Sequence, residues 1–417
     1  MTERPDPAAL DLLLRRCVEC GLCLPTCATW ASTGNEVLSP RGRLVLMQDL
    51  LEPTGDGDPG ALESFDRCIG CRACETACPS GVPFSLFEFG KELAAAARRK
   101  GAMPVDDPAV PSWLVGRLDR KPVLRALGAL RPLAVGPRLR RLASSLPSAP
   151  GDDAELARLL DRLIGSRQEG APRPADRDSA THAHGTGDVA IAFFTGCTGP
   201  SLMGATSRRL VDLLRHSGAA VRIPRGQDCC GALAGHTGRP QDREKLHARN
   251  GRAFAVQSKC DWIVVEAAGC GLELKGSGDF GPAAVLDATE ALARLDLPAL
   301  RPVPLKVAYH AACHLEHGQG VVGPPRELLR RIPALELVEP ADPELCCGSG
   351  GVWSLEHPDL AADIGLRKAE ALLGTGAQLV VTTNPGCLGQ ITSAVAALGA
   401  ELPILPLSDL VWYAALG

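Results

Sequence analysis

Two cysteine runs with the same spacing constrain the fold of this chain more than any other feature. They are Cys17-x2-Cys20-x2-Cys23-x3-Cys27 and Cys68-x2-Cys71-x2-Cys74-x3-Cys78, the second followed by Pro79. Three thiols spaced three residues apart can surround one face of a compact inorganic group from a single turn-rich loop. The fourth thiol of such a run usually points away, toward a second group. This part of the chain is therefore expected to fold around two such groups.

The spacing is that of bacterial ferredoxins, which predicts two [4Fe–4S] clusters. We expect crossed ligand sets: Cys17, Cys20, Cys23 and Cys78 for one cluster, and Cys68, Cys71, Cys74 and Cys27 for the other. Zinc sites instead use two CxxC pairs separated by a longer loop, so four cysteines within eleven residues favour iron–sulfur over zinc. The first run departs from the usual pattern in one respect, because Ala28 stands where Pro is usual.

Length, charge and cysteine content limit the class of protein. A chain of 417 residues predicts two or three domains. Seventeen cysteines are too few for a disulfide scaffold of this size. No secretory signal and no run of 18 apolar residues is visible, so we expect a cytoplasmic protein with reduced thiols and no transmembrane segment. A net charge of −4 gives no general attraction to nucleic acid, and no such partner is expected.

Apolar spacing predicts helices around the first cysteine runs. Residues 39–52 have a helical apolar face with Ser39 and Pro40 at its start, formed by Leu44, Val45, Leu46, Leu50 and Leu51. Residues 85–99 read as a second helix. An α-helical ferredoxin-like domain is therefore predicted over residues 1–100.

Residues 101–187 are predicted to be a basic helical segment and a flexible linker. Eleven Lys or Arg alternate with apolar residues over 98–141, which is typical of a solvated helix face or of a surface that lies on a membrane or a partner. Residues 166–188 are small, polar and turn-forming, as in linkers.

The second half of the chain contains an internal repeat with a period of 116 or 117 residues. Each copy has a single cysteine, a Cys-Cys-Gly and a second single cysteine. The first set is Cys197, Cys229, Cys230 and Cys270, and the second is Cys313, Cys346, Cys347 and Cys387. Cys260 has no counterpart and is interpreted as a packing residue.

Short β-branched runs precede the single cysteines and alternate with helices, which predicts a parallel or mixed sheet in each copy. Ligands of such sheets gather at the carboxyl ends of the strands, so we expect four cysteines to converge there in each module. An iron–sulfur cluster, a zinc ion, a redox-active thiol pair and buried structural cysteines all remain open for each set. His236, His310 and His314 lie near these cysteines in the sequence and are interpreted as structural residues before ligands.

The order of these motifs resembles the iron–sulfur subunit of glycolate oxidase. The motifs that carry the resemblance are CVECGLCLPTC, SPRGRLVLM, DRCIGCRACETACPSGV, DCCGAL, AAGCGLELK, ELCCGSGG and NPGC. The resemblance implies an α + α/β protein, with the helical [4Fe–4S] domain followed by tandem cysteine-rich (CCG) modules over 188–300 and 301–417. In heterodisulfide reductase relatives each module ends in CxxC and holds a non-cubane cluster. Here a single cysteine, Cys270 or Cys387, stands at that place.

The resemblance also implies partners. No G-x-G-x-x-G follows a strand, so we expect the flavin and the substrate on FAD-containing glycolate oxidase subunits and no catalytic residue in this chain. Electrons would pass through this chain to a quinone or another membrane acceptor, with peripheral contact at the inner face of the membrane. Related subunits serve lactate utilisation, anaerobic glycerol-3-phosphate oxidation and heterodisulfide reduction, and these remain alternatives. Two further hypotheses are a disulfide reductase acting through the CCG modules and a zinc protein that binds a partner.

Overall fold

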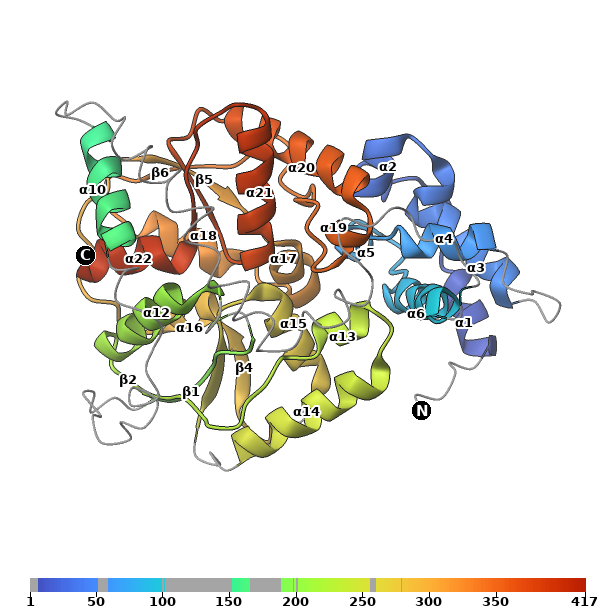
Figure 1. Cartoon of the computed structure of the whole chain (residues 1–417), viewed down its shortest axis with the longest axis horizontal. Helices are drawn as coiled ribbons and strands as arrows, with labels where there is room; N and C mark the ends of the chain where they lie inside the picture. Colours follow the sequence, from blue (N-terminus) through green and yellow to red (C-terminus); the bar gives the residue numbers. More distant parts are fainter. Residues whose placement is uncertain are drawn as a thin grey trace.

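The computed structural model describes residues 7–51, 59–99, 101, 152–165, 189–197, 199, 202–255, 260–278 and 280–417. The predicted basic segment and linker lie largely outside these residues. Figure 1 shows a helical N-terminal domain beside two α/β modules that pack against each other.

The N-terminal domain consists of short helices around the two cysteine runs. They are α1 (Pro7–Leu14), α2 (Ala28–Thr33), the 3-10 helix η1 (Glu36–Leu38), α3 (Pro40–Leu51), α4 (Pro59–Asp66), α5 (Ala73–Thr76) and α6 (Ser85–Arg99). Helices α3 and α6 confirm the two predicted helices. The hydroxyl of Ser39 accepts a hydrogen bond from the Gly42 amide (3.0 Å) and so caps α3. Leu44 of the expected face of α3 is buried, but the expectation is wrong at Val45, which is 53% exposed, because Met47, which it did not include, faces the core instead.

Each CCG module is a four-stranded, fully parallel sheet with helices on both faces. The first has strand order β2-β1-β3-β4 and the second β6-β5-β7-β8, so the two sheets have the same topology. Parallel pairing throughout confirms the predicted α/β class. Strands of both sheets are nearly all apolar, as expected for strands that are covered on both faces.

The elements of the first module are β1 (Val189–Phe194), α12 (Gly204–His216), β2 (Ala219–Arg222), α13 (Ala232–His236), α14 (Pro240–Ala255), β3 (Trp262–Val265), α15 (Ala268–Ser277), β4 (Ala284–Asp287) and α16 (Ala288–Arg294). Those of the second are β5 (Lys306–His310), α17 (Cys313–Gln319), α18 (Gly323–Arg330), β6 (Glu336–Val338), α19 (Trp353–Glu356), α20 (Pro358–Leu373), β7 (Leu379–Thr382), α21 (Pro385–Ala397), β8 (Ile404–Pro406) and α22 (Leu407–Leu416).

One hydrophobic core joins the two modules. It includes side chains from both sheets and from α22, which lies against α12 of the first module. A buried ion pair between Arg209 on α12 and Asp409 on α22 (2.9 Å) lies at this contact. Helix α10 (Asp152–Gly165) adds Leu159 and Leu160 to the same core. The two modules therefore share one continuous hydrophobic core.

The N-terminal domain packs against the second module. A second core cluster contains Ile69, Cys71 and Ala73 of the N-terminal domain together with Cys346 and other residues of the second module. Helix α2 lies beside α20, and α5 lies beside α17 (Figure 1). No helix within the described ranges is long and apolar enough to cross a bilayer.

Candidate metal centres

The two N-terminal cysteine runs share one backbone feature around their second cysteine. In each run, the residues directly before and after the second cysteine have positive φ. These residues are Glu19 (54°) and Gly21 (78°) in the first run and Gly70 (80°) and Arg72 (65°) in the second. Such left-handed residues are rare outside glycine and reverse the direction of the chain. A repeated, locally strained loop is what is needed to wrap three thiols around one compact group.

The first predicted ligand set lines a cavity at the surface. Its lining includes all four cysteines of that set, Cys17, Cys20, Cys23 and Cys78, together with Cys74, which is assigned to the second set. The cavity is partly open to solvent, and Leu44, Val82 and Phe87 contribute apolar walls. Cys20 is exposed, so this site lies at the edge of the protein. The residues fit a cluster that exchanges electrons with an outside partner.

The second predicted set is deeper in the domain. Cys27, Cys68 and Cys71 are buried and Cys74 is half-buried. Burial raises the pKa of Cys71 and of Cys74, and the neighbouring Cys27 raises both further. Thiols with such pKa values are protonated at neutral pH unless a metal binds them, because a coordinating thiol loses its proton. The proximity of Cys27 to Cys71 and Cys74 fits the crossed arrangement.

A buried cation, Arg43, and a half-buried one, Lys91, flank the second set. The Arg43 guanidinium is 1% exposed, donates to the Ser64 carbonyl (2.8 Å) and lies 4.0 Å from the Cys27 sulfur. The Lys91 ammonium donates to the Cys68 carbonyl. Buried cations are costly unless negative charge balances them, and thiolate ligands of a cluster supply that charge. Sequence reasoning missed both residues, because no local pattern distinguishes a buried Lys or Arg from one at the surface.

The first CCG module brings its four cysteines together as predicted. The sulfurs of Cys197 and Cys229 are 3.6 Å apart. Hydrogen bonds from Cys197 and then Cys230 lower the pKa of Cys229 to about 4. Cys230 in turn hydrogen-bonds Cys270. Gly231 follows with φ 107°, the left-handed conformation expected for the glycine after each cysteine pair.

The second CCG module repeats this arrangement, again with three buried cysteines and one half-buried. Hydrogen bonds link Cys313 to Cys346, Cys346 to Cys347, and Cys347 to Cys387. The bond to Cys346 and burial raise the pKa of Cys313 well above its usual range. The Cys387 sulfur also accepts a hydrogen bond from the Asn384 amide (3.6 Å).

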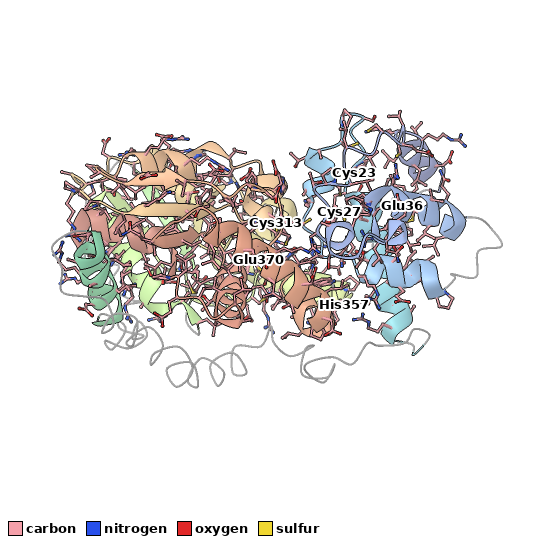
Figure 2. All side chains as sticks on the ribbon, turned by 90° about the horizontal axis from the view of Figure 1, so that it is seen from above. Cys23, Cys27, Glu36, Cys313, His357 and Glu370 are labelled. Carbon is pink, nitrogen blue, oxygen red and sulfur yellow. The ribbon has the colours of Figure 1, made fainter. Side chains whose placement is uncertain are left out.

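The second cysteine set and the second module adjoin each other. Cys313 is close enough to Cys71 to raise the pKa of its thiol. Nε2 of His314 lies 3.2 Å from the carbonyl of Gly70, inside the second cysteine loop. Figure 2 shows Cys27 and Cys313 on facing sides of the contact between the N-terminal domain and the module, with Cys23 farther out.

The three histidines that lie near these cysteines in the sequence differ in their roles. His236 and His314 stack across the two modules with ring centroids 6.0 Å apart. Burial lowers the pKa of His236 to about 3 and also lowers that of His314. His310 alone has a ring nitrogen within 4.8 Å of two cysteine sulfurs, those of Cys347 and Cys387, among the described residues.

A separate cavity lies where the carboxyl ends of both sheets meet. It is lined by residues of both modules, including Cys270, Glu266, Asp287 and Thr383. Burial raises the pKa of Glu266 to about 8 and that of Asp287 to about 7. Ser207 donates a hydrogen bond to Glu266 (2.8 Å), and Ser408 donates a second from the other module (3.2 Å).

Comparison with known proteins agrees with the motifs. The family model described as a 4Fe-4S dicluster domain matches residues 13–82, and that of the cysteine-rich domain CCG matches residues 191–275 and 307–392. These matches cover both N-terminal cysteine runs and both modules.

Three relatives cover nearly the whole chain. The probable glycolate oxidase iron–sulfur subunit of Bacillus subtilis is 30% identical over 96% of this chain and 94% of its own length. The glycolate oxidase iron–sulfur subunit of Escherichia coli is 31% identical over 92% of this chain and 91% of its own. One subunit of the fumarate reductase (CoM/CoB) of Methanothermobacter marburgensis is 31% identical over 90% of this chain and 66% of its own. With its helical 4Fe-4S domain, its tandem CCG modules and these relatives, the chain belongs to the family of glycolate oxidase iron–sulfur subunits.

Proposed function

We propose that this chain is the electron-transfer subunit of a flavin-dependent oxidoreductase that oxidises glycolate or another 2-hydroxy acid. Oxidation of such an acid releases two electrons, which a flavin accepts together. Iron–sulfur clusters then remove them one at a time. The sequence matches G-x-G-x-x-G at residues 276–281 and 318–323, but each match begins in the last turn of a helix (α15 or α17) and not after a strand. Neither therefore has the strand–turn–helix context of a dinucleotide site, which supports an FAD-containing partner subunit as the site of substrate oxidation. A quinone or another membrane acceptor receives the electrons.

Two [4Fe–4S] clusters with crossed ligands form the core of the proposal. Cys17, Cys20, Cys23 and Cys78 hold the outer cluster, and Cys68, Cys71, Cys74 and Cys27 hold the inner one. The observation that carries the proposal is the pair of cysteine loops with positive φ on both sides of the second cysteine. One loop is open to the surface at Cys20, and the other is buried against the second module. An exposed cluster can exchange electrons with a partner protein. A buried cluster can pass its electrons to a neighbouring centre within the chain.

Other relatives have names that suggest a competing function, namely service in a complex with a different substrate. They are the fumarate reductase (CoM/CoB) subunit of Methanothermobacter, the lactate utilization protein A of Exiguobacterium, and one subunit of the dihydromethanophenazine:CoB–CoM heterodisulfide reductase of Methanosarcina barkeri. If this chain serves such a complex, the clusters are retained and the substrate differs. We propose the same domain limits for either function: 1–100, 101–187, 188–300 and 301–417.

Selective loss of each cluster tests the proposal. Cys20→Ser is expected to remove the outer cluster and Cys71→Ser the inner one, each with a fall of about four iron atoms per chain. Iron and sulfide analysis with EPR of the reduced, anaerobically purified chain measures this. Cys260→Ser is the matched control, since Cys260 belongs to none of the four sets. Unchanged iron in Cys20→Ser, or equal loss in Cys260→Ser, would refute the ligand assignment.

A further inference from the structure

The second CCG module contains a compact set of metal-ligand atoms that includes a histidine. One ring nitrogen of His310 and the sulfurs of Cys347 and Cys387 all lie within 4.8 Å of one another, and all three side chains are buried. In a tetrahedral zinc site with metal–sulfur bonds of about 2.3 Å, neighbouring sulfurs are roughly 3.8 Å apart. The three atoms therefore already lie near the spacing that a single ion requires. A cluster of several irons is a larger body and holds its terminal ligands farther apart.

His310 has no other role in the part of the chain that the structure describes. The side chain is 1% exposed, and neither Nδ1 nor Nε2 has a hydrogen-bond partner. A buried polar atom without a partner is destabilising and calls for an explanation. Coordination to a metal ion explains one of the two nitrogens, since neutral imidazole is a common ligand of zinc and iron.

The first module lacks this ligand. β1 ends at Phe194 and β5 at His310, and the two residues have equivalent registers, because Phe194 pairs with Val265 on β3 and His310 with Thr382 on β7. The Phe194 ring packs against Phe254 (centroids 6.0 Å apart) in an apolar cluster. An apolar ring thus stands where the second module has an imidazole.

A buried charge distinguishes the modules as well. Lys368 on α20 is fully buried, and its ammonium is held by the carbonyls of Asp342 (2.9 Å) and Pro343 (3.4 Å). Cys346, Cys347, Asp342 and Cys387 all lie close enough to Lys368 for their charges to act on its ammonium. The equivalent position on α14 is Asn250, which is neutral and hydrogen-bonds the Cys229 carbonyl (2.8 Å). At these equivalent helix positions the second module thus has a cation and the first a neutral amide.

We propose that the second module holds a single divalent metal ion, zinc or ferrous iron, with His310, Cys347 and Cys387 as ligands and Cys313 or Cys346 as the fourth. Lys368 offsets the charge of the thiolates. The first module, with Phe194 and Asn250, does not hold the same centre. The two modules of the repeat are therefore chemically different despite their shared fold.

The test uses the full chain, purified anaerobically with its clusters in place. Metal analysis is expected to find one zinc per chain, or iron in excess of the two clusters. For zinc, X-ray absorption at the zinc edge should show a mixed shell of nitrogen and sulfur. For iron, Mössbauer spectroscopy should show one high-spin ferrous site apart from the clusters. A chain with no zinc and with all iron in clusters, or a zinc shell of sulfur alone, would overturn the proposal.

Two variants identify the ligand. His310→Phe installs the residue of the first module and is expected to lose that metal, or to bind it at least about tenfold more weakly. Phe has a volume near that of His and suits a buried site, and the EPR signals of the N-terminal clusters report whether the variant is folded. Cys270→Ser in the first module is the control and should keep the metal and its nitrogen ligand. Full metal content with an unchanged nitrogen signal in folded His310→Phe contradicts the assignment. If that variant does not fold, the test rests on the native chain, whose metal-edge spectrum shows whether a nitrogen ligand is present.

Discussion

Removal of the buried Arg43 charge is expected to lower the reduction potential of the inner cluster. The Arg43 guanidinium is 1% exposed and lies 4.0 Å from the sulfur of Cys27. It also donates to the Thr29 hydroxyl (3.2 Å), so its position is fixed. A cation at this place favours the reduced cluster, which carries one more negative charge. Arg43→Met removes the cation and keeps an unbranched side chain of moderate length.

The size of the effect follows from Coulomb's law. At about 7 Å from the added electron, and with an effective dielectric constant of about 20, one unit charge contributes roughly 2.4 kcal/mol. For a one-electron couple, about 1.4 kcal/mol corresponds to about 59 mV, so the full effect is about 100 mV. Protein relaxation reduces it, and we expect the inner cluster to shift by about −50 to −100 mV.

Potentiometric titration followed by EPR measures both clusters in one sample. The inner cluster should shift as stated, and the outer cluster less, because it lies farther from Arg43. Arg43→Lys is the matched control, since it retains the charge and should keep the potential near that of the native chain. No shift in Arg43→Met, or the same shift in both clusters, would contradict the placement of Arg43 beside the inner cluster.

Two further predictions concern the CCG modules. Gly348→Ala should destabilise the second module by about 2–3 kcal/mol, because φ is 87° and the new Cβ would lie 2.7 Å from the Ala361 carbonyl oxygen. Gly278→Ala, with φ 69° and no atom within 4 Å, should cost only about 1 kcal/mol in the same denaturant titration; equal effects would refute the steric argument. Burial raises the pKa of Glu266 from 4.5 to about 8. The native state therefore binds more protons than the unfolded chain within this window, and stability falls as pH rises through it. Glu266→Gln should flatten this dependence of the unfolding free energy between pH 4.5 and 8, and a curve parallel to that of the native chain would show that Glu266 ionises normally.

Spacing and periodicity in the sequence predicted the architecture well. The repeat predicted two modules of one topology, and the structure has two sheets of equivalent strand order. Apolar runs before Cys197, Cys270, Cys313 and Cys387 are strands β1, β3, β5 and β7. Convergence of the cysteines in each module could be predicted because the carboxyl ends of parallel strands share one edge of the sheet.

The residues that tune these sites could not be predicted in the same way. Arg43 and Lys368 are 1% and 0% exposed, yet each stands in a helix with ordinary charged neighbours in the sequence. Their burial depends on contacts with segments far away in the chain, such as the Ser64 and Asp342 carbonyls. His310 was interpreted as structural because a lone histidine has no characteristic spacing. Only its place at the end of β5 brings it to Cys347 and Cys387.

The proximity of the N-terminal domain to the second module also depends on tertiary structure. No pattern in the sequence indicates that Cys71 adjoins Cys313 or that the loop of Gly70 receives His314. Both contacts come from the packing of α5 against α17, which joins segments more than 200 residues apart. This contact places the cysteines of the second module beside the second N-terminal set.

Reduction of the clusters by substrate tests the central proposal most directly. The native complex would be isolated anaerobically through a tag on this chain, and glycolate added while the iron–sulfur absorbance is recorded. Our account predicts bleaching by glycolate, to an extent that Cys20→Ser or Cys71→Ser diminishes. Bleaching by dithionite but not by glycolate or lactate would contradict the assignment to 2-hydroxy acid oxidation.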